Sequence, residues 1–453
     1  MKRLITLLCI IATASCAKTS IATTQDNSFV LTNINIVDTE HHTIHRNKSI
    51  LVNAGKIQQI AETATALHPK TGRVIDGKGG YVTPGLIDMH VHMYEKAAFT
   101  IALSHGVTHV RIMNGVPDQL HWRDQVEAGQ LIGSSATVSS PIISAYNDAP
   151  LHHTVHTVEQ AQNAVTQFKA AGYDLIKVYG NLSEGALTAI VVAGRQLAMP
   201  VAKHGPHASG DMPVTALTGL QSLEHVEDIY QGPLNHEFAP HRLPAIAEAI
   251  KSTGVPVTPT LNIYYQLTML SNEKDTFLAS IPTNYTSDII ALEASQNQVK
   301  RWLSASENMA RHNQKTFKFL QHITDVLSDT GVPLLVGSDS GVLLSPHGLA
   351  THNEMRLMHQ AGLSVYEVLA AATINPAKAL NLHNEIGKIA ENYAADFIYS
   401  TANPVEEMSV LTYPDAVIKK GVWYSKEQLT ALRENAIESR SVWAELSTLI
   451  KAL

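Results

Sequence analysis

The sequence predicts an α/β protein in which a (β/α)8 (TIM) barrel is joined to a small β-sandwich domain built from both chain ends. In the middle of the chain, strand-like and helix-like patterns alternate, which is typical of a barrel of parallel strands. Short β-like runs broken by Gly and Asn fill residues 28–82, and a similar texture returns in residues 385–425. The length of 453 residues accommodates both units, because one barrel takes about 250 residues or more.

Eight strands are predicted within residues 83–384, and helical patterns such as Val158–Ala171 and Ser183–Leu197 separate most of them. Residues 264–330 are too long for an ordinary connection, and their apolar periodicity predicts extra helices that form either a lid or wall or a purely structural insertion. A C-terminal helix is predicted over residues 426–453. The strands are Leu86–His92, Val107–Asn114, Ala136–Ser144, Leu175–Gly180, Pro200–Gly205, Ser222–Val226, Pro256–Leu261 and Pro333–Asp339.

The composition excludes several classes of protein. Hydrophobic residues make up 45% of the chain and charged residues 16%, which is ordinary for a globular protein and excludes wholesale disorder. The formal net charge of −7 leaves no electrostatic footprint for nucleic acid or for an anionic membrane surface. The 23 His residues are an excess that directs the search toward metal sites.

An export signal is predicted at residues 1–17, MKRLITLLCIIATASCA. Two cations precede a short apolar run and then small residues, which is the order of a signal peptide. Residues 13–16 resemble a lipobox, in which Cys16 would carry a lipid anchor, and ordinary cleavage near Ala14 or Ala17 is the alternative. We expect an exported, periplasmic protein, either soluble or lipid-anchored, with no other contact to a membrane.

Both cysteines, Cys9 and Cys16, lie in this segment. The mature chain would therefore form no disulfide despite its oxidising compartment, and it would offer no thiolate to a metal. The remaining ligand types are His, Asp, Glu and Lys.

Candidate metal ligands of these types end several predicted strands. His90 and His92, in PGLIDMHVH, share one side of a strand because alternate residues share a face. His204 follows PVAK, His225 ends SLEHV, and Asp339 ends PLLVGSD. Since the carboxyl ends of barrel strands meet at one mouth, these side chains are expected to converge there.

Lys177, in DLIKVYG, lies on a strand that a barrel buries on both faces. A buried lysine is costly unless it is paired or chemically used. Carbamylation by CO2 would turn its amine into a carboxylate able to bridge two cations. A lysine that reaches solvent from the end of the strand is the alternative.

Together these motifs resemble the metal-dependent amidohydrolase superfamily, in its branch related to imidazolonepropionase and the binuclear prolidases. The strand His pair, the strand Lys, SLEH, VGSD and the tail LAAATINPAKALNL follow the family order over nearly the whole mature chain. The ligands that the resemblance implies are His90, His92 and Asp339 for one metal, His204 and His225 for a second, and carboxylated Lys177 between them.

Three further residues are candidates for contacting substrate. His207, close to His204, is expected to form a pocket wall. Tyr230, five residues past His225, would take the place of a tyrosine that prolidase-like members use on the substrate carbonyl, or it is an ordinary loop aromatic. Arg111, at the end of the second strand, would bind a substrate carboxylate or pair with a structural acid.

The expected activity is metal-dependent hydrolysis of a carbon–nitrogen bond in a small molecule. Imidazole and carboxylate ligands suit Zn²⁺, and two such ions lower the pKa of a shared water, so that a bridging hydroxide is the nucleophile. Asp339 is placed to move a proton to the leaving nitrogen as general acid–base.

The expected substrate is an N-acyl amino acid, an Xaa-Pro-like dipeptide or a cyclic amide. A lactone or phosphotriester hydrolase is an alternative, since the same hydroxide attacks several electrophiles. An inactive barrel that serves as a binding protein is another, against which the intact Asp339 argues. Exact substrate and homo-oligomerisation are left open.

Overall fold

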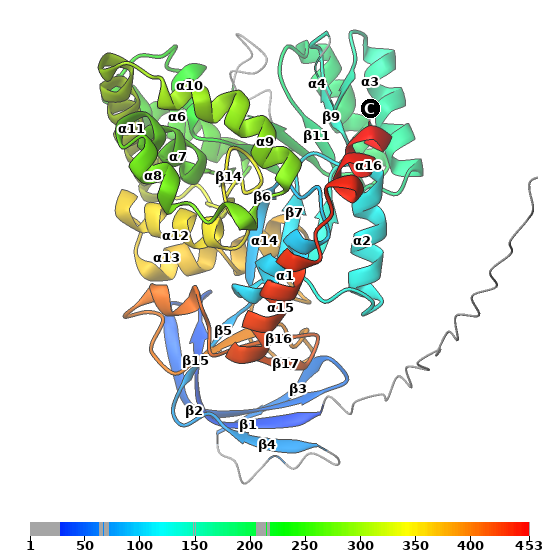
Figure 1. The fold of residues 1–453 in the computed structure, drawn as a ribbon, viewed down its shortest axis with the longest axis vertical. Helices are drawn as coiled ribbons and strands as arrows, with labels where there is room; N and C mark the ends of the chain where they lie inside the picture. Colours follow the sequence, from blue (N-terminus) through cyan, green and yellow to red (C-terminus); the bar gives the residue numbers. More distant parts are fainter. Residues whose placement is uncertain are drawn as a thin grey trace, which may run out of the picture.

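The computed structural model describes residues 28–62, 67, 72–147, 149, 151–204, 214 and 218–452. The predicted export signal and Cys16 lie outside these residues. The protein is mixed α/β, with a body of helices and parallel strands above a separate β-sheet (Figure 1). In the part of the chain described, no helix has both the length and the apolar character needed to cross a bilayer.

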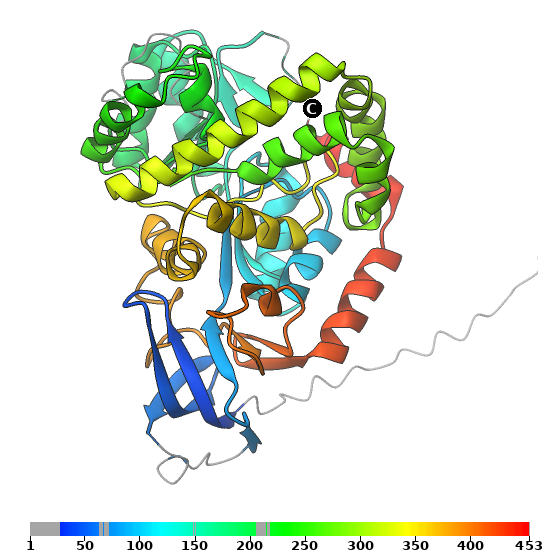
Figure 2. The same cartoon turned by 90° about the vertical axis from the view of Figure 1, so that its left-hand side faces the viewer.

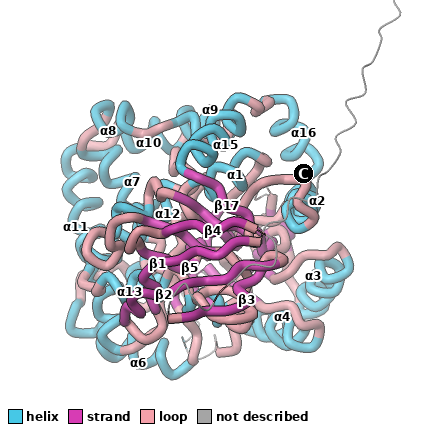
Figure 3. Tube along the Cα trace, turned by 90° about the horizontal axis from the view of Figure 1, so that it is seen from below, coloured by secondary structure: helices cyan, strands magenta, loops and turns pink. Residues whose placement is uncertain are grey.

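Both chain ends contribute strands to the lower sheet. The strands pair in the order β17-β16-β15-β5-β1-β2-β3, with β4 on β1, and Figure 3 shows them side by side from below. The sheet is joined at β5, which pairs in parallel with β1 and antiparallel with β15. The bounds are β1 (Phe29–Asp38), β2 (Thr43–Asn53), β3 (Lys56–Ala61), β4 (Arg73–Asp76), β5 (Tyr81–Pro84), β15 (Phe397–Ser400), β16 (Ala416–Lys419) and β17 (Val422–Ser425).

A single apolar cluster holds this sheet together. Phe29 and Leu31 from the first strand pack with Phe397 and Ile418 from the last three, and all four are buried. The aromatic ring of Trp423 on β17 lies edge-on to Phe29, with ring centroids 5.9 Å apart. The two ends of the chain therefore share one core and depend on each other for burial.

In the upper body the strands pair in parallel. One sheet has the order β6-β7-β8 and the other the order β10-β9-β11-β12-β13-β14. Single bridges join Ser139 to Leu175, Val257 to Leu334 and Ser340 to Val91. These bridges connect the two sheets and the segment after β14 into a ring of paired segments that begins and ends at β6. The bounds are β6 (Leu86–Val91), β7 (Val107–Ile112), β8 (Ser135–Val138), β9 (Ile142–Ser144), β10 (His152–Thr154), β11 (Ile176–Val178), β12 (Val201–His204), β13 (Ser222–Glu224) and β14 (Val257–Thr258).

Two of the predicted strands differ from the observed ones. The prediction of one strand over Ala136–Ser144 was wrong: β8 and β9 are separate, because Pro141 between them has no N–H to donate. Pro333–Asp339 is not a regular strand either. Its Val336 N–H donates to Ala371 O, away from both neighbouring strands. The segment still bonds to both neighbours, because the Leu335 N–H donates to Val257 O and the Asp339 N–H donates to His90 O.

Helices cover the outside of these strands (Figures 1 and 2). The helices predicted over 158–171 and 183–197 are confirmed, and the hydroxyls of Thr157 and Ser183 cap their first turns. The bounds are α1 (Ala97–Ser104), α2 (Pro117–Glu127), α3 (Val158–Ala170), α4 (Glu184–Gln196), α5 (Glu227–Gln231), α6 (Leu243–Thr253), α12 (Leu349–Ala361), α13 (Val365–Ala371) and α14 (Ile374–Ala379).

The long connection after β14 is helical, as predicted. It contains α7 (Leu261–Asn272), α8 (Asp275–Ser280), α9 (Asp288–Gln296), α10 (Gln298–Leu303) and α11 (Glu307–Thr330). The long helix α11 crosses the upper body and packs against α6, α7 and α12 (Figure 2).

The C-terminal region forms two helices where one was predicted, namely α15 (Lys426–Glu438) and α16 (Val442–Ala452). The break lies at Arg440, whose guanidinium binds Glu95 and the carbonyl of Asn284. These contacts hold α16 against the upper body, beside α2 and α9.

We expect Phe397→Ala to lower the free energy of unfolding by about 3–5 kcal/mol, because it removes a fully buried ring from the shared core. Urea denaturation followed by circular dichroism measures the change. Leu292→Ala, at a side chain that is 64% exposed, is the control and should change stability by less than about 0.5 kcal/mol. Equal midpoints for the two variants would contradict the shared core.

Candidate metal centre

Three buried ligand groups from distant parts of the chain meet at the carboxyl ends of the parallel strands. His90 lies near the end of β6, His225 directly follows β13, and Asp339 lies in the extended segment beside β6. One ligand atom of each residue lies within 4.8 Å of the others. These three residues, each predicted at the end of a strand, therefore lie together in the structure.

Two further imidazoles extend this group. His92 Nε2 lies 2.9 Å from Asp339 Oδ1. The ring of His225 lies between those of His90 and His204, with centroid distances of 4.6 and 4.3 Å. Four imidazoles and one carboxylate thus form a continuous cluster, which we call the histidine cluster.

Lys177 lies on β11, paired in register with Ala202 of the strand that ends in His204. Its side chain is 2% exposed, and Nζ has no hydrogen-bond partner among the residues described. Burial lowers the pKa of Lys177 to about 8, against the raising effect of Glu224. A buried amine without a hydrogen-bond partner is costly, so this position is an unusual one for an unmodified lysine.

The backbone is strained at two cluster residues. His225 and Asp339 have φ of 67° and 52°, in the left-handed region that non-glycine residues seldom adopt. Hydrogen bonds hold both in place: His225 Nδ1 lies 2.6 Å from Thr260 Oγ1, and the Asp339 N–H donates to His90 O.

The electrostatics of the cluster suit cation binding. Burial lowers the pKa of His90 to about 4, and the charge of Lys177 adds to the decrease. Burial also lowers the pKa of His225, well below its usual range. For Asp339, burial acts to raise the pKa, but the charges of His90 and His92 outweigh it and lower the pKa. Neutral His90 and His225 beside an ionised Asp339 are the forms that bind a divalent metal.

Glu224 is a site residue to which the sequence analysis assigned no role. It is fully buried on β13 and accepts hydrogen bonds from His90 Nδ1 at 2.8 Å and from Arg111 Nη2 at 2.6 Å. This contact orients the His90 ring, so that Nε2 faces Asp339. The sequence feature that could have identified Glu224 is its place in SLEH, because a charged residue on a strand buried on both faces needs a partner.

Asp228 was also missed as a contact of the cluster. It is buried in the first turn of α5, and its Oδ2 lies 3.2 Å from His204 Nε2. It adds a second carboxylate on the His204 side of the cluster. The short helix that begins after His225 places Asp228 beside the cluster, and the sequence analysis did not predict this helix.

The structure surrounds the guanidinium of Arg111, a candidate for either a substrate contact or a structural ion pair, with buried hydrogen-bond acceptors. Its guanidinium is fully buried and donates to Met89 O, Gln221 Oε1, Ser222 Oγ and Glu224 Oε1. Four of its five N–H groups are used in this way, which leaves no fork free for a carboxylate. Pairing with a structural acid, the alternative left open by the sequence, accounts for these contacts.

Of the two other substrate candidates, Tyr230 lies within the residues that the structure describes. Tyr230 lies in α5 and is 4% exposed, with its ring packed against Phe238 and Phe319 at centroid distances of 5.2 and 5.9 Å. These contacts match a core aromatic better than a substrate ligand. His207 lies outside the residues that the structure describes.

A mixed α/β fold with imidazoles and carboxylates gathered at the ends of parallel strands is typical of metal-dependent hydrolases. Residues 81–424 match the model of the amidohydrolase family, and the chain belongs to that family. It is therefore an enzyme that hydrolyses carbon–nitrogen bonds, and the predicted family membership is confirmed.

Similar proteins agree with this assignment. The imidazolonepropionase of Idiomarina loihiensis is 24% identical over 425 residues, which cover 86% of this chain and 94% of that protein. Among solved structures, a bottromycin amidohydrolase has a TM-score of 0.76 at 22% identity and covers 92% of this chain and 91% of its own. A Xaa-Pro dipeptidase with bound methionine has a TM-score of 0.68 at 19% identity, with coverages of 88% and 100%. At these identities the solved structures show the fold alone.

We expect Arg111→Met to lower the free energy of unfolding by about 3–5 kcal/mol, because it leaves the charge of Glu224 buried and unpaired. Chemical denaturation measures the loss. Arg123→Met removes a partly exposed ion pair with Asp174 and should cost no more than about 1 kcal/mol. If Arg111 bound substrate and had no structural role, the Arg111→Met variant would instead have a raised KM and an unchanged unfolding curve.

Proposed function

We propose that this chain hydrolyses an amide bond at a pair of divalent cations held by the histidine cluster. The observation that carries this proposal is the convergence of four imidazoles and Asp339 near a buried lysine, whose amine has no hydrogen-bond partner among the residues that the structure describes.

The ligand assignment follows the cluster. His90, His92 and Asp339 would hold one ion, and His204 and His225 the other. Lys177, carboxylated by CO2, would lie between the two ions, and Zn²⁺ suits this set of nitrogen and oxygen donors. When bound, the ions would supply Lewis acidity and a water whose pKa is lowered toward neutrality.

The side chains of the cluster divide the remaining work. The Asp339 carboxylate accepts a proton from the attacking water and returns it to the leaving nitrogen as general acid–base. Glu224 accepts a hydrogen bond from the His90 Nδ1–H, which keeps Nε2 unprotonated and available as a ligand. The hydrogen bond between Thr260 and His225 fixes the second ring in the same way.

The proposed substrate is an N-acyl amino acid, an Xaa-Pro-like dipeptide or a cyclic amide. The similarity to proteins named imidazolonepropionase and Xaa-Pro dipeptidase supports an amide over a lactone or phosphotriester. No residue described here discriminates among the three amide classes.

We also propose that the cyclic order of parallel pairs is a (β/α)8 barrel of residues 83–384, with residues 28–82 and 385–425 as the small domain. The bridges at Val257 and Ser340, which connect the last segment to both neighbours, support the closed barrel. Export through residues 1–17 stays a prediction from their sequence alone.

Asp339→Asn tests the proposed mechanism. Because an amide cannot take up the proton, kcat should fall by about 10²–10⁴-fold on the best substrate from a panel of acyl amino acids, dipeptides and lactones. Metal content is measured in the same sample by elemental analysis, and His322→Asn on the exposed side of α11 is the control. Wild-type turnover by the Asp339 variant would refute the proposal.

Lys177→Ala tests the bridging role. We expect the variant to bind about one metal equivalent less than the wild type and to lose activity, with partial rescue by added formate or acetate, which replace the missing carboxylate. Mass spectrometry of the intact wild-type protein should show the added CO2 under mild conditions. Full metal occupancy without rescue would count against a bridge at Lys177.

A further inference from the structure

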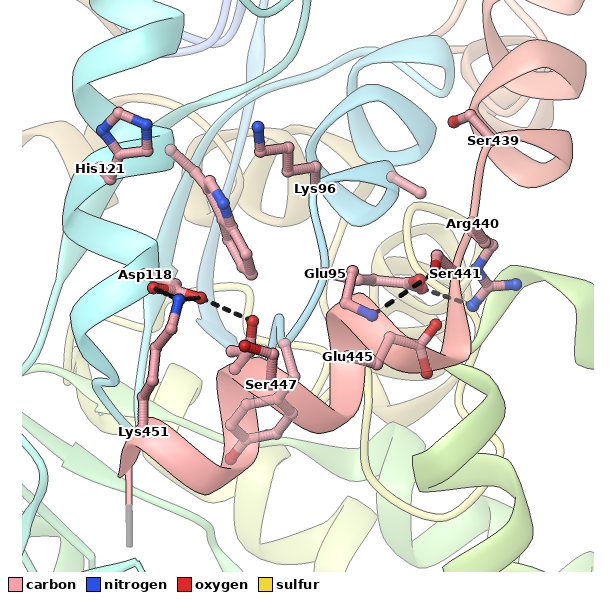
Figure 4. Close-up of a pocket in the computed structure, with 15 residues that line it drawn as sticks. Glu95, Lys96, Asp118, His121, Ser439, Arg440, Ser441, Glu445, Ser447 and Lys451 are labelled. Carbon is pink, nitrogen blue, oxygen red and sulfur yellow. Dashed lines mark hydrogen bonds and ion pairs between the residues drawn. The ribbon is translucent and has the colours of Figure 1, made fainter. Parts of the chain in front are cut away.

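Two buried glutamates hold the beginnings of helices in this structure. Glu445 on α16 (Figure 4) accepts a hydrogen bond from the Ile289 N–H at the start of α9. Glu354 on α12 accepts hydrogen bonds from the N–H groups of Leu261 and Asn262, at 3.0 and 2.6 Å, at the start of α7. The start of α7 also bonds to a segment that carries a ligand of the histidine cluster, so this second contact bears on the metal centre.

The side-chain amide of Asn262 makes that connection. Its Nδ2 donates to Ser338 O and to Ser345 Oγ, both at 2.7 Å. Its Oδ1 accepts a hydrogen bond from Asn353 Nδ2 at 2.7 Å. Because a carbonyl only accepts hydrogen bonds, the contact with Ser338 O settles which end of the amide is the nitrogen. Asn262 is 1% exposed, so loss of its amide would leave buried groups without their partner.

The peptide group between Ser338 and Asp339 is held at both ends. Its carbonyl, Ser338 O, accepts the hydrogen bond from Asn262. Its N–H, that of Asp339, donates to His90 O at 2.8 Å. The orientation of this peptide plane sets the φ angle of Asp339, which at 52° lies in the left-handed region. Such an angle persists only where the surrounding structure opposes its relaxation, and Asn262 supplies one of the two restraints.

Helix α12 supports this arrangement from outside the cluster. Besides the two residues that bond to Asn262, its Thr351 Oγ1 donates to Asp88 Oδ2 at 2.6 Å. Asp88 Oδ1 in turn accepts a hydrogen bond from the Ser338 N–H at 3.0 Å. One turn of α12 therefore restrains Ser338 on its N–H side and on its carbonyl side.

The start of α7 also reaches the other half of the cluster. Thr260 Oγ1 donates its proton to Pro259 O at 2.8 Å, so the same oxygen accepts the hydrogen bond from His225 Nδ1. Thr260 and Asn262 are only two residues apart. One short segment therefore contacts both a ligand of the second proposed ion and the backbone beside a ligand of the first.

We propose that Asn262 is a positioning residue of the metal centre, which holds the Asp339 carboxylate in place through the Ser338 carbonyl. Glu354 and Asn353 fix Asn262 itself, so the start of α7 acts as a rigid support. This inference rests on the proposed function, because it takes Asp339 as a metal ligand. Without the Asn262 amide, the peptide plane is free to rotate, and relaxation of φ at Asp339 moves the carboxylate away from the imidazoles.

Asn262→Ala tests this support. The affinity for Zn²⁺, measured by competition with a chelator on the metal-free protein, should fall by about 10–100-fold, as is usual when a group that orients a ligand is lost. We expect kcat to fall by a similar factor, with KM changed by no more than about twofold. Asn272→Ala is the matched control, because it removes an amide at the other end of the same helix, where Nδ2 donates to Thr268 O.

Asn353→Ala keeps the proposal testable if Asn262→Ala does not fold. Asn353 is half-buried on α12, and its removal leaves the Asn262 amide present but deprives Oδ1 of its partner. Zn²⁺ affinity should fall in the same direction by a smaller factor. A purely structural role would lower the melting temperature and leave the affinity and kcat of the folded protein unchanged. Wild-type affinity in folded Asn262→Ala, or in Asn353→Ala should the first variant not fold, overturns the proposal.

Hydrogen exchange separates a failure of this proposal from a failure of the proposed function. In the metal-free protein, mass spectrometry should show faster exchange of the peptide that contains the Asp339 N–H in Asn262→Ala than in the wild type or in Asn272→Ala. Unchanged exchange overturns the support by Asn262, whatever the metal content. Faster exchange in a protein whose wild type binds no Zn²⁺ would instead refute the metal centre and leave the backbone support standing.

Discussion

The buried ion pair between Arg111 and Glu224 fixes the geometry on which the histidine cluster depends. The Arg111 guanidinium links β7 to the Met89 carbonyl of β6 and to the Glu224 carboxylate of β13, and that carboxylate also accepts a hydrogen bond from His90 Nδ1. Burial acts to raise the pKa of Glu224, but Arg111 and His90 outweigh it and lower the pKa. Three strands are thus tied together by charged groups, where an ordinary core would use apolar packing. Such a pair contributes little net stability, yet removing either partner leaves an uncompensated charge, so the network favours one arrangement of the strands.

The positions of the ligands could be predicted from the sequence because parallel strands bring their carboxyl ends to one edge. His90, His225 and Asp339 lie far apart in the chain, but each ends a run that alternation and flanking residues mark as a strand. Helices α3 and α4 were predictable for a similar local reason, since Thr157 and Ser183 mark their beginnings. These features depend on short stretches of sequence, so they can be predicted without knowing which distant residues they contact.

The contacts around the ligands could not be predicted in this way. Glu224 matters because Arg111 and His90 lie beside it, and neither is near it in the chain. The same limit applies to Arg111, whose sequence position allowed both a substrate contact and a structural pair. The left-handed backbone at His225 ends β13 one residue before the histidine, although a strand through Val226 was expected. Tertiary context decides such cases, because a local pattern does not show which groups will surround a buried charge.

The sheet shared by both chain ends has a consequence for biosynthesis. Strand β5 emerges early from the ribosome, but its antiparallel neighbour β15 is among the last segments to be made, and Val82 pairs with Tyr399. Until then, one edge of the N-terminal sheet has no strand beside it, and unpaired edges invite association between nascent chains. Closure of the sheet is also slowed by the length of chain between the two strands. A product truncated before Phe397 should therefore aggregate instead of folding into a smaller domain.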